Sequence, residues 1–363
     1  MLRYLSLKVE IMIAAFFVNP RAGCGIQYNM IGSDSIDLSR CGKSESKIMA
    51  ASFLSSIRYE GVEFLTASGQ MGEDFLKASP GIIYRVIYTA DDDTDSSDTE
   101  NFLDEAKGEH PDLLIFVGGD GTASVVSQYG WDGPVLAVPA GTKMFSSVFP
   151  LNVRRSAEIF NNMKKGGYPG MRWGEVVDID NDRDKDKPFH MKLMGYLKVP
   201  DSENIIPVSK AETDGDDGDE LTGCFASSLD NGTYIFGPGN TCKAVMSEIG
   251  IKGTIHGFDI VKNRTMVVKD ASREQILEYA AEGRLVLSPL GKQGFILGRG
   301  NRQIDADLVE KIGFSRIIII ATQRKVADLE TLYFDIPGFT GPIPQFIKVV
   351  TGCGRFKLIR AKS

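Results

Sequence analysis

The sequence has few of the residues from which metal and disulfide sites are built. Its 363 residues include five cysteines and three histidines. The cysteines are odd in number and form no Cys-x-x-Cys pair, so we expect no structural zinc and a reducing, cytoplasmic environment. The histidines, His110, His190 and His256, lie outside every glycine-rich stretch, which disfavours a histidine-dependent hydrolase.

The sequence also lacks a long apolar run and an excess of positive charge. Residues 11–18 form an apolar run much shorter than the ~20 residues of a membrane-spanning helix. Lys8 and Glu10 precede this run and no small-residue cleavage pattern follows it, so we expect no signal peptide. The net charge of −7 argues against nucleic-acid and membrane partners. We expect small-molecule nucleotide ligands and a homo-oligomer.

A buried strand and a glycine turn stand together in the first half of the chain. Residues 113–117 are apolar and bounded by glycine, which predicts a strand covered on both faces of a parallel sheet. The turn Gly118-Gly119-Asp120-Gly121-Thr122 follows, and residues 122–129 can form a helix. A strand, a glycine turn and a helix in this order present backbone N–H groups and a helix dipole to an anion.

Asp120 is unexpected in an anion-binding turn. A carboxylate about 4 Å from a bound phosphate is repelled by roughly 4 kcal/mol at an effective dielectric constant of about 20. The residue is explained if it holds Mg²⁺ that also binds phosphate, or if it accepts the proton of an attacking hydroxyl. The alternative is that Asp120 only caps the following helix through its side-chain oxygen.

Two other turns follow predicted strands of the first half. Asn19-Pro20-Arg21-Ala22-Gly23 follows the run 11–18, and Pro139-Ala140-Gly141-Thr142-Lys143 follows the run 134–138. Strand and helix patterns alternate between them, which predicts a parallel sheet with right-handed crossovers. These turns would then lie at the carboxyl edge of the sheet, where ligands bind in open α/β folds.

The regular alternation of predicted strands and helices stops after about residue 150. We expect a helix at 154–165, a hairpin of strands at 176–179 and 191–199, an acidic linker at 214–220, and renewed alternation from 221. The predicted fold class is α/β. The predicted domains are a Rossmann-like N-terminal parallel-sheet domain (1–150), a second α/β or mixed α+β domain (151–350) and a C-terminal tail (351–363). The acidic run 91–95 is interpreted as a solvated loop.

The second half contains two glycine-rich loops that suit a nucleotide or phosphate. Gly237-Pro238-Gly239-Asn240-Thr241 follows a short strand, and Asp259 lies roughly twenty residues further on, a partial match to the dinucleotide-binding fingerprint. A tight strand–helix turn is an equal alternative. The later loop offers glycine amides and polar donors, unless it is a hairpin with glycine bulges; these residues are Gly291, Lys292, Gly294, Gly298, Arg299, Gly300 and Asn301.

The Gly-Gly-Asp-Gly-Thr turn resembles the signature of the NAD kinase superfamily, which is related to the diacylglycerol and sphingosine kinases and more distantly to the phosphofructokinases. The turns at 19–23 and 139–143 resemble matching turns of those kinases. With residues 288–301, the chain is similar to a branch of ATP- or polyphosphate-dependent NAD kinase-like proteins of archaea and bacteria. The resemblance implies transfer of a phosphoryl group from ATP or polyphosphate to a hydroxyl of NAD, giving NADP, with Mg²⁺.

The resemblance also implies a role for each candidate residue. Asp120 would be the catalytic base or a Mg²⁺ ligand. The donor phosphates would be held by Asn19, Gly23, Gly118, Gly119, Gly121, Thr122 and Lys143. The acceptor would be held by Gly237, Gly239, Asn240, Thr241, Asp259, Gly291, Gly294, Arg299 and Asn301.

The chain departs from the family in its acceptor half. It has no Gly-x-Thr-Ala-Tyr stretch, and Gly174-Glu175-Val176-Val177 stands where the resemblance implies an Asn-Glu pair. Lys143 differs from the Gly-Asn-Asp ending of the lipid kinases, which disfavours a lipid acceptor. The alternatives are therefore a kinase of another small-molecule or lipid hydroxyl, and a nucleotide or dinucleotide sensor without catalysis.

Overall fold

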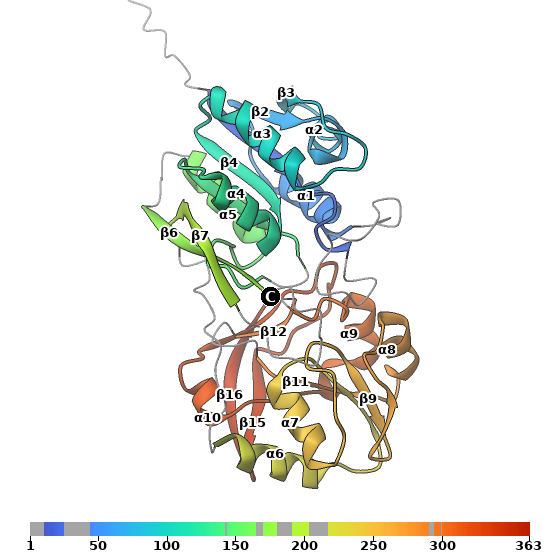
Figure 1. The fold of residues 1–363 in the computed structure, drawn as a ribbon. Coiled ribbons are helices and arrows are strands. Elements are labelled where there is room, and N and C mark those ends of the chain that lie inside the picture. Colours follow the sequence, from blue (N-terminus) through green and yellow to red (C-terminus); the bar gives the residue numbers. More distant parts are fainter. Residues whose placement is uncertain are drawn as a thin grey trace, which may run out of the picture.

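The computed structural model describes residues 11–24, 44–141, 144–164, 170–179, 191–202, 217–289, 294–298 and 300–363. The described strands form one sheet of five strands, one of nine and one of two (Figure 1). The five-stranded sheet is parallel and the nine-stranded sheet is mixed. This confirms the predicted α/β fold class with a parallel first sheet and a second, mixed one.

The first sheet places β1 and β4 side by side at its centre. Its order is β3-β2-β1-β4-β5, so the chain runs outward from β1 in one direction and from β4 in the other. Such a reversal is the topological switch point at which open α/β sheets bind ligands. The strands are β1 (Met12–Val18), β2 (Val62–Ala67), β3 (Ile83–Tyr88), β4 (Leu113–Gly118) and β5 (Val135–Pro139).

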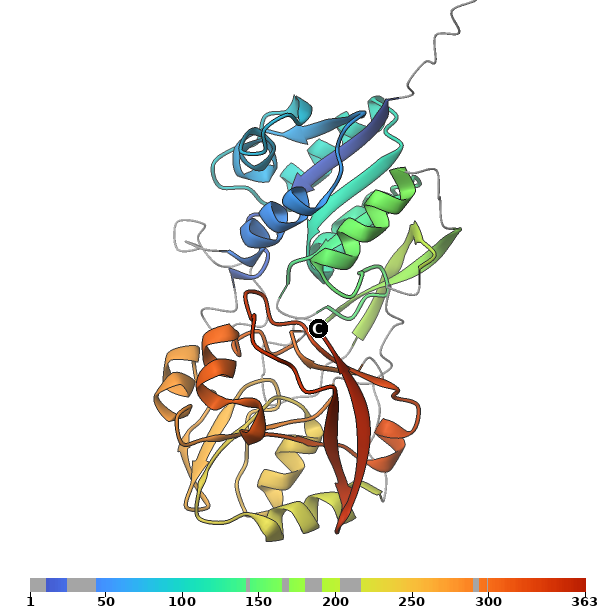
Figure 2. The ribbon, with the colours of Figure 1, turned by 180° about the vertical axis from the view of Figure 1, so that it is seen from behind.

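Helices cover both faces of this sheet because its strands are apolar on both sides. All six residues of β4 are buried. Phe102 of α3 packs against Phe17 on one face, and Phe53 of α1 packs against Phe160 of α5 on the other. Figures 1 and 2 show these two layers from opposite sides. The helices are α1 (Glu45–Ser56), α2 (Glu73–Lys77), α3 (Ser96–Gly108), α4 (Asp120–Tyr129) and α5 (Val153–Lys164).

The hairpin β6–β7 also packs on the first sheet. Strands β6 (Met171–Ile179) and β7 (Met191–Pro200) are antiparallel, as predicted. Val176, Leu197 and Val199 are buried in the same apolar core as β1 and β4. Helix α5 and the hairpin β6–β7 therefore share the core of the first sheet, whereas the sequence analysis placed the chain from residue 151 onward in the second domain. The alternating pattern after residue 150 did not reveal which sheet the hairpin covers.

The nine-stranded sheet organises the second half. Its order is β10-β9-β8-β11-β13-β15-β16-β14-β12, and β8, β11, β13 and β15 are parallel. The strands are β8 (Thr233–Phe236), β9 (Asp259–Lys262), β10 (Thr265–Val268), β11 (Arg284–Leu287), β12 (Phe295–Leu297), β13 (Ile317–Ile320), β14 (Thr331–Phe334), β15 (Phe346–Gly352) and β16 (Arg355–Lys362). The helices are α6 (Asp217–Ser228), α7 (Asn240–Glu248), α8 (Arg273–Tyr279), α9 (Ala306–Ile312) and α10 (Gln323–Ala327).

Two expectations for the second half are wrong. The segment expected to be a tail forms the end of β15 and the strand β16, which lies inside the sheet between β15 and β14. Helix α6 begins at Asp217, inside the expected acidic linker.

Cys224 of α6 and Cys353 of the β15–β16 turn form a disulfide, and Cys24 is also disulfide-bonded, whereas Cys242 is free and buried. In the described part of the chain, no helix combines the length and apolarity needed to cross a membrane.

Candidate functional site

The turns after β1 and β4 meet at the switch point of the first sheet. The backbone N–H of Asn19 donates to the carbonyl oxygen of Val117 at 2.9 Å. The Asn19 Nδ2 donates to the hydroxyl of Thr122, also at 2.9 Å. The structure therefore brings together Asn19 and Thr122, two of the predicted donor-site residues.

Glycine is required where the turns after β4 and β5 touch. A Cβ atom on Gly141 would lie 2.9 Å from the Cα of Gly119, and one on Gly119 would lie 3.2 Å from the Cα of Gly141. The Ala140 N–H donates to the Gly118 carbonyl oxygen at 2.9 Å. A Cβ on Gly118 would collide with the side chain of Thr122. The glycines of both motifs thus allow two backbones to pack directly against each other.

Asp120 is the first residue of α4 and is held by the next loop rather than by its own helix. Its side chain is buried, with the residue 6% exposed. Its Oδ2 accepts from the Phe145 N–H at 2.6 Å and its Oδ1 from the Ser146 N–H at 3.1 Å. The cap position of α4 is Gly119, which has no side-chain hydrogen bond. The alternative in which Asp120 merely caps its helix is therefore wrong.

The loop that holds Asp120 is in turn held by the β6–β7 hairpin. The Ser146 hydroxyl donates to the Val177 carbonyl at 3.1 Å and accepts from the Val177 N–H at 3.0 Å. Ser147 makes the corresponding pair of bonds with Glu175, through its own N–H at 2.9 Å and its hydroxyl at 2.8 Å. This support was not predicted from the sequence. The Ser146-Ser147 pair just beyond the Pro139–Lys143 motif indicates hydroxyls that bond to backbone, but it does not indicate that the partner is β6.

The first turn of α4 offers unused backbone donors. The N–H groups of Gly121 and Thr122 have no acceptor among the described residues. Gly121 is exposed, and nothing lies within 4 Å of where its Cβ would be. Because a helix N-terminus carries partial positive charge, an anion can approach these amides. A bound phosphate would then lie beside the carboxylate of Asp120.

The Asn19–Gly23 turn is anchored on both sides. Arg21 pairs with Asp93 at 2.5 Å and donates to the Thr94 carbonyl oxygen at 2.7 Å. The acidic run expected to be solvated is thus partly tied to the turn. Gly23 has a φ of +83°, and a Cβ there would lie 2.5 Å from the Cβ of Glu45. Glu45 therefore lies directly against the turn, which the sequence pattern gave no means of seeing.

The described residues do not form a metal site by themselves. Within them, no three Asp, Glu, His or Cys side chains come together as possible metal ligands. Both oxygens of Asp120 already accept backbone N–H groups. Mg²⁺ is often held by one carboxylate together with phosphates and water. Asp120 therefore does not fit a metal held by protein side chains alone, and any Mg²⁺ would have to be held largely by the phosphates.

Asp259 is buried, and both of its side-chain oxygens are bonded within the protein. It is fully buried, and its Oδ2 accepts from Lys243 Nζ and from the Thr254 N–H, both at 2.7 Å. Its Oδ1 accepts from the Asp270 N–H at 2.9 Å. Burial lowers the pKa of Lys243, and Asp259 opposes this shift. The carboxylate that the dinucleotide spacing suggested for a ribose instead braces the loops around α7. Lys243, its partner, was not singled out because a helical lysine is usually exposed.

The other predicted residues of the first glycine loop lie around the start of α7. Gly239 has a φ of +105° and provides no side-chain cap for the helix. Asn240 is exposed, whereas Gly237 and Thr241 are buried. A Cβ on Gly237 would lie 2.5 Å from the side chain of Leu287. The loop is thus a tight strand–helix turn, with Asn240 as its exposed polar side chain.

The later glycine loop is described only in part. Gly291 and Arg299 of this loop lie outside the described residues, as does Lys143 of the turn after β5. Gly294 has a φ of +73°, and its carbonyl accepts from the Tyr333 N–H at 2.8 Å. Asn301 is 6% exposed; its Nδ2 donates to the Ile296 carbonyl at 2.6 Å and its Oδ1 accepts from the Gly298 N–H at 3.0 Å. Asn301 therefore braces the loop.

Two family models match the chain. The family model of the ATP-NAD kinase N-terminal domain matches residues 15–168, and that of the ATP-NAD kinase C-terminal domain matches residues 229–360. A search of curated proteins found no match. A crystal structure from Bacillus anthracis str. Sterne, assigned as a diacylglycerol kinase, is 16% identical with a TM-score of 0.25. The match covers 50% of this chain and 46% of that one.

Proposed function

The chain belongs to the NAD kinase superfamily, and we propose that it transfers a phosphoryl group from ATP or polyphosphate to a hydroxyl of NAD, forming NADP. The observation that supports this most directly is the position of Asp120. Its carboxylate is buried beside the unused amides of Gly121 and Thr122, and it is oriented by two amides of the following loop. A carboxylate and two backbone N–H groups that could bind an anion are thus next to each other.

This arrangement suits phosphoryl transfer because such reactions depend on positioning and charge stabilisation. The amides of Gly121 and Thr122, at the positive end of α4, would bind the transferred phosphate. The carboxylate of Asp120, held by the Phe145 and Ser146 amides, would accept the proton of the acceptor hydroxyl. Asn19 would keep Thr122 and its amide in place through the bond between their side chains. Mg²⁺ would neutralise charge on the donor phosphates when bound with them.

The acceptor would be held between this turn and the second half of the chain. Asn240 is the exposed polar residue of the α7 loop and is our candidate for a contact with the acceptor. Gly237, Gly239 and Thr241 would act by shaping the loop. Asp259, Gly294 and Asn301 are assigned to bracing, because their polar groups are already bonded within the protein.

The deciding experiment incubates the purified protein with NAD and either ATP·Mg²⁺ or polyphosphate, and measures NADP. We expect NADP with at least one donor, and comparison of the two identifies it. NADH and other hydroxyl compounds are tested in parallel. Calorimetry with ATP·Mg²⁺ and NAD accompanies the assay. Tight binding without any phosphorylated product from either donor would reject the kinase and support a nucleotide sensor.

A further inference from the structure

A buried group of charges joins the two halves of the chain. Arg302, between β12 and α9, forms an ion pair with Glu45, the first residue of α1. Its Nη2 also lies 3.2 Å from Oδ2 of Asp335, which follows β14. The side chains of Arg302, Glu45 and Asp335 are 6%, 9% and 14% exposed. In both views the second sheet lies below the first, with α9 on the side facing α1 (Figures 1 and 2).

Burial offsets much of the stability that the attraction between these charges could give. Burial lowers the pKa of Arg302, and the Asp335 carboxylate raises it. The Nε of Arg302 is buried and has no hydrogen-bond acceptor among the described residues. Because the desolvation of buried charges largely offsets their attraction, such groups contribute little net stability but fix geometry when they are retained. A role in setting the relative position of the two halves fits these features better.

Contacts connect Glu45 to the Asn19–Gly23 turn and, through it, to the first turn of α4. Glu45 packs against Gly23, and the N–H of Ser46 donates to the Ala22 carbonyl at 3.2 Å. The same turn begins with Asn19, which bonds to Thr122 in the first turn of α4. A displacement of Glu45 would therefore move the turn that supports the unused amides of α4.

Contacts also lead from Asp335 to the glycine loop of the second half. The Asp335 N–H donates to the Leu297 carbonyl at 3.1 Å. Gly298 packs so closely on Asp335 that a Cβ would lie 2.7 Å from the Asp335 Cβ. Asn301, next to Arg302, closes the loop through its bonds to Ile296 and Gly298. Arg302 therefore binds one carboxylate from each half: Glu45 from the first and Asp335 from the second.

We propose that Arg302 is a positioning residue. It sets the distance between the Asn19–Gly23 turn of the first half and the loop that follows β12 in the second half. This inference rests on the proposed function for its kinetic consequence, but not for its structural one. Arg302 touches neither donor nor acceptor in this role. It acts through Glu45 and Asp335, and its loss would misplace the acceptor relative to the transferred phosphate.

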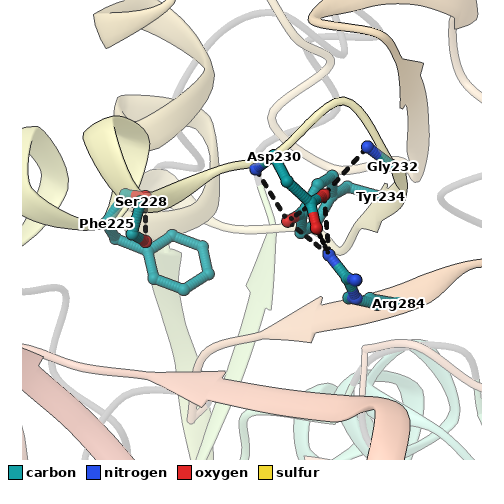
Figure 3. A network of polar contacts seen from close by, with 6 residues as sticks. All are labelled: Phe225, Ser228, Asp230, Gly232, Tyr234 and Arg284. Atoms are coloured by element: carbon teal, nitrogen blue, oxygen red, sulfur yellow. Dashed lines mark hydrogen bonds and ion pairs between the residues drawn. The ribbon is translucent and has the colours of Figure 1, made fainter.

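The kinetic test compares Arg302→Met with a matched control, Arg284→Met. Arg284 also pairs with an aspartate, Asp230, at 2.8 Å and donates to Tyr234 at 2.7 Å, but this pair is exposed and lies wholly within the second half (Figure 3). We expect Arg302→Met to lower kcat about tenfold to a hundredfold. KM for the donor should change less than about threefold, because the Gly121 and Thr122 amides that would bind the donor phosphate are still present. Arg284→Met should change neither. An unchanged kcat in Arg302→Met, or an equal loss in both variants, overturns the proposal.

A second measurement applies whether or not the protein turns over. Hydrogen exchange is followed in residues 20–24, 44–47 and 294–298 of the unliganded protein. We expect exchange in all three segments to be faster by about tenfold or more in Arg302→Met, and unchanged in Arg284→Met. Protection that stays as in the original protein overturns the proposal, while a failure of wild-type turnover overturns only the kinase. If Arg302→Met does not fold, Glu45→Gln is used with the same criteria, since it removes one charge and keeps the shape.

Discussion

The carboxylate of Asp120 and the backbone N–H of Phe145 are joined by a hydrogen bond of 2.6 Å across 25 residues of chain. Together with the bond from Ser146, this contact fixes both oxygens of the carboxylate. The protein itself therefore holds the Asp120 carboxylate in one orientation. Such preorganisation is a main source of catalysis in phosphoryl transfer.

We predict that Asp120→Asn removes turnover while ATP binding stays measurable. The amide cannot accept a proton at neutral pH, so we expect kcat to fall by roughly 10²–10⁴. Its NH₂ group would also face a backbone N–H, at a cost of about 1–3 kcal/mol of stability. NADP formation, calorimetry and urea unfolding measure the three effects. Asp305→Asn is the control, because Asp305 accepts the Leu308 N–H at 3.1 Å in α9, away from the turn. Turnover equal to the wild type in Asp120→Asn would remove Asp120 from the mechanism.

We predict opposite outcomes for two alanine substitutions in the glycine motifs. In Gly141→Ala the new methyl group meets the backbone of Gly119, so the two turns must separate. We expect a loss of about 1–3 kcal/mol, as for other overpacked sites. In Gly121→Ala the methyl group enters open space, and the helix gains up to about 1 kcal/mol. Thermal unfolding of both variants checks this, and a destabilised Gly121→Ala would contradict the described turn.

We predict that Lys243→Met strongly destabilises the second half. The substitution leaves the fully buried Asp259 without its cation, which typically costs about 3–5 kcal/mol. The double variant Lys243→Met with Asp259→Asn should recover part of this loss. Urea unfolding measures both, and KM for NAD is determined for Asp259→Asn. A raised KM with unchanged stability would instead support the ribose contact that the sequence suggested.

We predict a pH-dependent contribution from the exposed pair in Figure 3. Hydrogen bonds from Arg284, Gly232 and Tyr234 lower the pKa of Asp230 from 3.8 to about 2. The carboxylate thus stabilises the fold above pH 3.8 and loses this effect as the pH falls toward about 2. The difference in urea midpoint between wild type and Asp230→Asn should be constant above this window and shrink within it. Added salt should reduce it. A difference that grows on acidification would be the wrong sign.

The first sheet could be predicted from the sequence because each strand, turn and helix is indicated by residues that are close together in the chain. The apolar run 113–117, its glycine turn and the helix after it predict β4, the turn and α4 without reference to distant residues. The switch point then follows from chain order. Asp120 could be singled out for the same reason: it is an anion placed among anion-binding amides.

The partners of these residues could not be predicted because they are distant in sequence. No local pattern links Glu45 to Arg302, or Ser146 to Val177. Strand β16 was taken for a tail because its exposed basic residues hide the alternation with Ile359, which is buried. Asp259 illustrates the opposite error, in which a spacing matched a binding motif while burial gave the carboxylate a structural task.

The support of Ser146 and Ser147 by β6 has a consequence for synthesis on the ribosome. The turn containing Asp120 emerges early, but the loop that donates hydrogen bonds to Asp120 is braced only when β6 has followed and paired with β7. A nascent chain that stops at residue 168, where the first family match ends, has every residue of the donor motifs and still lacks the framework that orients them. The orientation of the Asp120 carboxylate therefore depends on a segment that lies beyond all three glycine motifs of the first half.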